Sequence, residues 1–158
     1  PYNRAVSDLA GATPTQFLER LSSRLSVEPT RDTTPSKGDA SMYLDGRWYR
    51  LALSDRAPKA GADPVGLLDV SLLQDQVLGP VLDVTDIRTD PRVRFVGGIR
   101  GTAELERLVD SGQAAVAFSM SAVTVAELLA IADADAIMAP KSTWFEPKLR
   151  DGLLTHLI

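Results

Sequence analysis

The chain has 158 residues, a formal net charge of −4 and 24% charged residues, which is enough sequence for one domain with a hydrophobic core. It contains no cysteine and a single histidine, His156. Disulfides, thiolate nucleophiles and multi-histidine metal sites are therefore excluded, and we expect no metal ligands. The acidic balance argues against general nucleic-acid binding. No apolar run approaches the roughly 20 residues that span a bilayer, and no secretory signal is visible, so we expect a cytoplasmic protein.

The first half of the chain predicts a helix, a loop and a β-hairpin, in that order. A capping-box pattern at Thr13 starts a helix over residues 13–25. Residues 28–40 have almost no apolar side chains and are expected to form a loop. Residues 41–53 predict two strands around Asp45-Gly46, a dipeptide that tolerates the positive φ angles of a tight turn.

The second half predicts helices that alternate with strands. Asp69 is expected to cap a helix that Gly79-Pro80 ends or kinks, and Thr124 starts a second capping box. The expected helices are 70–82, 103–112 and 125–134, and the expected strands are 92–98, 114–120 and 152–158. The buried stripe predicted for the last helix is Val125, Leu128, Leu129 and Ala132. The order indicates an α+β (mixed α/β) single domain, with a mixed sheet flanked by about four helices and the hairpin.

The segment APKSTWFEPKLRDG, residues 139–152, concentrates hydrogen-bond donors between two prolines. Lys141 and Lys148 can both point at one negative group, and Ser142 and Thr143 add hydroxyl and backbone N–H donors. The prolines reduce the entropy lost when the loop is ordered, so we predict that this loop faces an anion. The alternative is a proline-braced connection whose charges are solvated.

A second candidate is the segment of residues 88–101, which has a glycine turn leading into a helix. Such a turn is a generic anion site, because unpaired N–H groups point outward at a helix N-terminus, and Arg100 would lie at its rim. The glycine spacing matches neither a nucleotide P-loop nor the dinucleotide fingerprint. The alternative is an ordinary strand, turn and helix in which Asp86 and Asp90 pair with the arginines. Asn3 and Arg4 are further candidates, against the alternative of a surface strand.

Several of these segments resemble a known family. They are PYNRAV, LLQDQVLGPVLDVTDIRTDPRVRFVGGIRG, ELERLVDSG, AVAFSM and MAPKSTWFEPKLRDGLLTHL, which are similar to the C-terminal part of the bacterial and archaeal domain of unknown function 1015. The last segment is the most specific, since only Ala139 departs from the family's M-P-P-K-S-T-x-F-x-P-K pattern. The resemblance implies that residues 1–158 are a C-terminal-type domain, and that a ParB-like N-terminal half with an Asp-Gly-His-His-Arg element is absent from this chain.

The resemblance also implies a function. ParB-like folds include nucleotide hydrolases and kinases that act on free serine, although fold kinship is only an analogy for function. We therefore expect a phosphate-, phosphometabolite- or nucleotide-binding half of a phosphotransferase-like enzyme, without deciding whether this chain is itself an enzyme. Nucleotide and magnesium would bind through the absent N-terminal half. The expected anion ligands are Lys141, Ser142, Thr143, Lys148, Arg100, Asn3 and Arg4.

Two other classes of function stay open. One is a DNA-binding, chromosome-partition-like protein that contacts phosphates through Arg88, Arg92, Arg94 and Arg100, against which the acidic net charge argues. The other is a structural or dimerisation domain. The expected partners are a small phosphorylated molecule and the N-terminal domain of the parent protein, with homo-oligomers left open, and we expect neither nucleic acid nor membrane as a partner.

Overall fold

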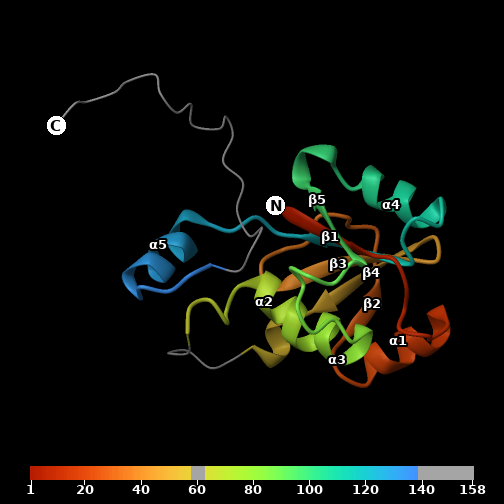
Figure 1. Ribbon diagram of the computed structural model, residues 1–158, viewed down its shortest axis with the longest axis horizontal. Coiled ribbons are helices and arrows are strands. Elements are labelled where there is room, and N and C mark those ends of the chain that lie inside the picture. The colour runs from red at the N-terminus through yellow and green to blue at the C-terminus, as the bar shows by residue number, and fades with distance from the viewer. Residues whose placement is uncertain (58–62, 139–158) are drawn as a thin grey trace.

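The computed structural model describes residues 1–57 and 63–138, which form a six-stranded sheet with helices on both faces (Figure 1). The order across the sheet is β2 (Val27–Pro29), β4 (Arg47–Ala52), β3 (Asp39–Leu44), β6 (Val116–Met120), β1 (Tyr2–Val6) and β5 (Val93–Gly97). The predicted α+β class is confirmed. The sheet is antiparallel in every described pairing, however, and not mixed. Strands β5 and β6 would be parallel neighbours if they paired, but β1 lies between them and is antiparallel to both.

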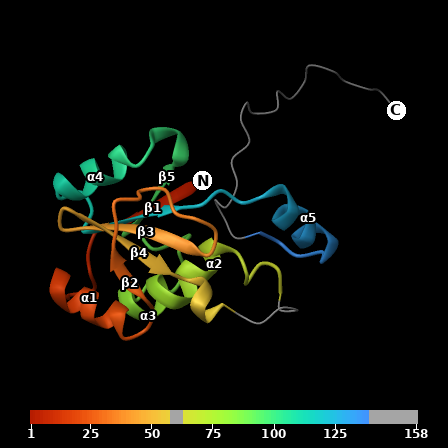
Figure 2. The ribbon, with the colours of Figure 1, turned by 180° about the vertical axis from the view of Figure 1, so that it is seen from behind.

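The helices are divided between the two faces of the sheet and one of its ends (Figures 1 and 2). One face packs against α1 (Pro14–Ser22), α2 (Asp69–Leu73) and α3 (Gly79–Leu82), and the other against α4 (Ala103–Asp110). The remaining helix, α5 (Val125–Asp133), lies beyond the end of the sheet where β6 ends. In the described part of the chain, no helix combines the length and apolar character needed to cross a bilayer.

Side-chain alternation along the strands divides the core into two clusters. In β1, Val6 belongs to the larger cluster beneath α1, α2 and α3, whereas its neighbour Ala5 belongs to the smaller cluster beneath α4. Strand β6 is buried over its whole length, as its apolar sequence predicts. Because each strand residue faces one cluster or the other, neighbouring residues of β1 face different environments.

The local signals of the sequence form as predicted. At α1, the N–H of Gln16 donates to Thr13 Oγ1 at 3.3 Å, and the equivalent bond at α5 joins Glu127 to Thr124 at 3.2 Å. The hairpin between β3 and β4 turns at Asp45 and Gly46, with φ angles of 48° and 77°. These features depend on contacts within a few residues, so the sequence alone specifies them.

The predicted interruption before Pro80 takes the form of a wide turn. Residues Gln74–Leu78 form one turn of π-helix between α2 and α3. Proline lacks an N–H and its ring clashes with the carbonyl four residues earlier in a regular helix. The carbonyl of Gln76, which loses that partner, instead accepts a hydrogen bond from Arg24 Nε at 3.4 Å. The π turn thus lets an interrupted helix continue along the core.

Two predictions about helix α2 and helix α5 are wrong. Asp69 is the first residue of α2 and does not cap it, because its carboxylate accepts the N–H of Gly38 at 3.0 Å. In α5, the predicted buried residues Val125 and Leu129 are 72% and 57% exposed, whereas Ile131 is buried. The helix projects past the sheet, so it has only a narrow side available for packing.

Helix α5 is bound to the end of the sheet by a network centred on Lys37. The Nζ atom of Lys37 lies 2.7 Å from a carboxylate oxygen of Glu127 in α5 and 3.1 Å from one of Asp69 in α2. The same Asp69 oxygen accepts a hydrogen bond from the hydroxyl of Ser121. Three segments that are distant in sequence therefore meet at this ammonium group.

We predict that Lys37→Met loosens α5 from the sheet. The substitution removes both ion pairs and leaves the buried carboxylate of Asp69 without its cation, which is unfavourable in a partly desolvated setting. Amide hydrogen exchange in residues 125–133 should become faster, while exchange in β3 and β6 stays unchanged. The control is Lys37→Arg, which keeps the positive charge. Equal exchange of α5 in the wild type and Lys37→Met would contradict the assigned role.

The same network predicts how stability depends on pH. Burial alone would raise the pKa of Glu127, but the hydrogen bonds from Lys37 and Thr124 bring it below 4.5. Burial alone would lower the pKa of Lys37, but its bonds to Glu127 and Asp69 bring it above 10.5. The stabilisation is therefore complete between pH 4.5 and 10.5 and is lost as pH falls through the Glu127 pKa or rises through that of Lys37. The difference in unfolding free energy between wild type and Lys37→Met, measured in urea, should be flat inside this window and shrink outside it.

Candidate anion-binding site

A cavity of about 870 Å³ lies along β5, at the end of the sheet where β1 begins. Its walls come from the start of β1, from β5 with the short 3-10 helix Gly98–Arg100 that follows it, and from α4. The chain passes closely at this corner, since a Cβ atom on Gly98 would lie 2.7 Å from Pro1. Only glycine allows β1 and the turn after β5 to approach in this way.

Three arginines line one side of the cavity. Arg107 donates two hydrogen bonds to the carboxylate of Glu104, at 2.7 and 2.9 Å, and Arg100 lies 3.7 Å from the same carboxylate. Arg94 in β5 completes the group. The hydrogen bonds from Arg107 lower the pKa of Glu104, so the carboxylate stays ionised. Three guanidinium groups surround one carboxylate, and this side of the cavity carries an excess of positive charge.

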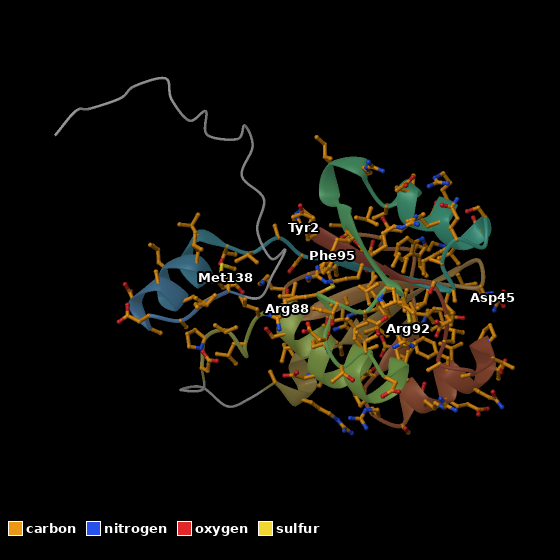
Figure 3. The ribbon with its side chains drawn as sticks, viewed as in Figure 1. Tyr2, Asp45, Arg88, Arg92, Phe95 and Met138 are labelled. Atoms are coloured by element: carbon orange, nitrogen blue, oxygen red, sulfur yellow. The ribbon has the colours of Figure 1, made fainter. Side chains whose placement is uncertain are left out.

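The other side of the cavity is aromatic. Tyr2 in β1 and Phe95 in β5 make an edge-to-face contact, with ring centroids 6.4 Å apart and planes at 85°. Figure 3 shows the two labelled residues next to each other, where β1 and β5 pair. The guanidinium carbon of Arg4 lies over the ring of Phe95, 5.3 Å from its centroid, within the range of a cation–π interaction. The aromatic wall thus separates a buried cation from the cavity.

Arg4 is the most unusual side chain of the described structure. It is 1% exposed, its Nη1 donates to the carbonyl of Tyr2, and its Nε has no hydrogen-bond partner in the described residues. No described carboxylate forms an ion pair with it. Burial lowers the pKa of Arg4 to about 10, which corresponds to a cost on the order of 3 kcal/mol for keeping the charge.

Asn3 lies on the opposite face of the sheet from Arg4, because successive residues of β1 alternate. Its side chain is 2% exposed, and its Oδ1 accepts the N–H of Met120 at 3.0 Å. The paired register of β1 and β6 stops at Arg4, so the Asn3 amide continues the hydrogen bonding beyond that point. The expectation of a surface strand at the start of the chain is wrong, since all of β1 is buried.

The structure places the predicted anion ligands in different parts of the protein. Arg100 lies on the cavity wall, 67% exposed in its side chain, and Arg4 lies behind Phe95. Asn3 is directed toward β6. Four of the predicted ligands, Lys141, Ser142, Thr143 and Lys148, lie outside the described residues. Whether the two predicted segments converge around one anion therefore stays a prediction.

Sequence reasoning missed four lining residues of this site. Arg107 and the aromatic pair belong to elements that are distant in sequence and meet only through the sheet order, and Arg94 was considered only as a DNA contact. One signal was available, because Arg94 and Phe95 alternate within the predicted strand and must face opposite sides. The missed residues are Tyr2, Arg94, Phe95 and Arg107.

The other two arginines of the predicted phosphate-contacting strip, Arg88 and Arg92, form ion pairs with carboxylates. Arg88 lies 2.9 Å from Asp86 and Arg92 lies 2.6 Å from Asp90, and Figure 3 shows both arginines on the segment that leads into β5. The hydrogen bonds to Asp90 raise the pKa of Arg92. This is the pairing that the sequence offered as the alternative to an anion strip.

The helix that follows the glycine turn, α4, has no side-chain cap at its N-terminus. Thr102 occupies the N-cap position, but its side chain makes no capping hydrogen bond. Its hydroxyl instead donates to Thr33 at 3.1 Å. Among residues 1–57 and 63–138, no group of three or more acidic or histidine side chains is placed to hold a metal ion.

Comparison with known proteins gives one match. No curated protein and no solved structure matches the chain significantly. Residues 1–71 match the model of the family described as "Protein of unknown function (DUF1015)". The matched part contains β1 with Tyr2 and Arg4, and it ends within α2. The match covers 71 of the 158 residues, so the chain is similar to this family over less than half of its length.

Proposed function

We propose that this chain binds the phosphoryl group of a small phosphorylated molecule or nucleotide in the cavity along β5, as one half of a phosphotransferase-like enzyme. The observation that carries the proposal is the cavity wall on which arginines outnumber carboxylates, with the buried guanidinium of Arg4, which has no carboxylate partner among the described residues, behind Phe95 on the other wall. An isolated buried charge is unfavourable, and such charges in proteins are normally paired or bound to a ligand. An anion in the cavity would face the arginines of the basic wall directly and would offset the charge of Arg4 from the other side of the aromatic wall.

Phosphate suits this site better than a neutral ligand does. Arginine presents a planar fork of N–H donors that matches the oxygens of a phosphoryl group. Arg94, Arg100 and Arg107 exceed the single carboxylate of Glu104 in charge, so the entrance attracts anions. The volume of about 870 Å³ is within the range of sites for small molecules and cofactors, and the aromatic wall offers a surface for a ring.

The proposed role of these residues is charge neutralisation and positioning. Phosphoryl transfer needs little covalent chemistry from the protein, because most of the catalysis comes from orienting the group and stabilising its charge. Lys141, Ser142, Thr143 and Lys148 remain proposed ligands that would approach the phosphoryl group from a second segment. A ParB-like partner domain that supplies nucleotide and magnesium, and a cytoplasmic location, belong to the same proposal.

We predict that Arg4→Met reduces stabilisation by phosphate compounds without unfolding the protein. Methionine has a similar volume and is neutral, and replacing a buried unpaired charge by an apolar side chain is often neutral or stabilising. Without ligand, the melting temperature of the variant should equal or exceed that of the wild type. Pyrophosphate, phosphoserine and ATP should be tested separately, and the variant should bind the active compound roughly 3- to 10-fold more weakly, as expected when a nearby charge is lost without a direct hydrogen bond.

The matched control for this experiment is Arg47→Met, which removes an exposed arginine at the start of β4. It should keep the ligand-induced shift in melting temperature. A large loss of stability in Arg4→Met before any ligand is added would show that Arg4 already has a partner within the protein. The proposal would then lose its main support.

We also predict that Lys141→Ala and Lys148→Ala each weaken binding of the same phosphate compound. Removing one ammonium contact to an anion should reduce affinity about 3- to 30-fold. Isothermal titration at low and moderate salt measures this effect, and both variants should show a smaller salt dependence than the wild type. Unchanged affinity in both variants would remove residues 139–152 from the site and leave the role of Arg4 to be judged by its own variant.

A further inference from the structure

We infer that the outer edge of β5 is a docking edge for an extended acidic peptide, which would pair with it as a seventh strand. This inference goes beyond the phosphoryl site, since it concerns main-chain pairing and a protein partner. It comes from the register of β5, the contrast between the two edges of the sheet, and the charge of the cavity wall.

The register shows which main-chain groups of β5 are unpaired. The N–H of Gly98 donates to Pro1 at 2.8 Å, and the N–H of Ser7 donates to Arg92 at 3.0 Å. Hydrogen-bonded pairs alternate with non-bonded pairs in an antiparallel ladder. The even-numbered residues from Arg92 to Gly98 therefore form the hydrogen bonds to β1. The N–H and C=O groups of Phe95 and Gly97 consequently point away from the sheet. In the described chain no strand lies beyond β5, and both residues line the cavity.

The opposite edge of the sheet is protected, whereas this one is not. Strand β2 has only three residues and ends in Pro29, which has no N–H to donate. Short strands and prolines are common devices against unwanted pairing. Strand β5 has five residues and no proline. In the described part of the chain, one edge is therefore blocked and the other keeps unpaired main-chain donors and acceptors beside a cavity.

The charge beside this edge favours an acidic peptide. Arg94, Arg100 and Arg107 lie around the single carboxylate of Glu104 on the same cavity wall. Ile99, which is 79% exposed, gives an apolar contact at the end of the strand. A peptide that adds to an edge gains affinity from main-chain bonds and specificity from alternate side chains. A strand that alternates acidic and apolar residues would meet the arginines on one side and the aromatic wall on the other.

Position 97 allows an edge-specific test. Gly97 has a φ angle of −60°, which proline adopts without strain, and its N–H points outward. The variant Gly97→Pro therefore removes one donor to the peptide while the bonds to β1 remain. The matched control is Gly97→Ala, which keeps the N–H. Its Cβ would lie 3.9 Å from Ile99, an ordinary contact distance.

The probe is a fluorescein-labelled hexapeptide of alternating Glu and Val, measured by anisotropy, with a Lys and Val hexapeptide as the charge control. We expect the wild type and Gly97→Ala to bind the acidic peptide alike and to bind the basic one more weakly. Gly97→Pro should bind the acidic peptide about 3- to 10-fold more weakly, because one main-chain hydrogen bond is lost. Hydrogen exchange of the Phe95 and Gly97 amides of the wild type, measured residue by residue with NMR, should slow when the acidic peptide is added.

Three results would overturn the inference. They are absence of binding by the acidic peptide, equal affinity in Gly97→Pro and Gly97→Ala, and amides of Phe95 and Gly97 that are already protected without peptide. The pyrophosphate-induced shift in melting temperature, measured on the same proteins, separates this inference from the phosphoryl proposal. A protein that responds to pyrophosphate and not to peptide contradicts only the docking edge. One that binds peptide and ignores all phosphate compounds contradicts only the phosphoryl site.

Discussion

The pairing of β1 with both β5 and β6 is the constraint on which the rest of the structure depends. It joins the first residues of the chain to strands that lie about a hundred residues later, and it separates two strands that α4 connects. A buried central strand also determines the environment of every side chain it carries. Arg4 has no access to water there, so the cost of its charge is a direct consequence of strand order.

The two polar residues of β1 lie on opposite faces of the sheet and have different partners. Asn3 replaces a missing main-chain partner for Met120 and is satisfied within the protein. Arg4 faces the larger core and is satisfied only in part, by the Tyr2 carbonyl and the face of Phe95. Buried polar groups are almost always paired, so Arg4 differs from Asn3 in keeping one donor, its Nε, without a partner among the described residues. The sequence presents the two residues as equivalent neighbours.

Features that depend on nearby residues could be predicted from the sequence, and those that depend on strand order could not. The caps at Thr13 and Thr124 and the turn at Asp45-Gly46 were predictable, because the interacting groups are a few residues apart. The burial of Arg4 was not, since a short strand at the chain start carries no sign of its position in the sheet. The exposed side of α5 was misjudged for a related reason, because periodicity shows that a helix has an apolar stripe but not what covers it.

The candidate site, too, depends on strand order and so could be predicted from the sequence only in part. Donor density in residues 139–152 and the arginines of residues 88–101 could be read directly, but their spatial relation could not. The cavity combines Arg107 of α4 with Tyr2 of β1, which are distant in sequence and meet only across the edge of the sheet. Residue types therefore indicated the chemistry of the site, and the topology supplied its aromatic wall and its buried cation.

The π turn at residues Gln74–Leu78 affects how well this part of the chain tolerates the deletion of a residue. A π turn holds one residue more than the α turn that it replaces, and the residues after it are rotated accordingly about the helix axis. Val77, Leu78, Val81 and Leu82 are all buried in this arrangement. A variant that lacks one residue here could keep the same core by reverting to a regular helix, provided that Pro80 is also replaced. This segment is thus a place where the chain could lose a residue without rebuilding the sheet.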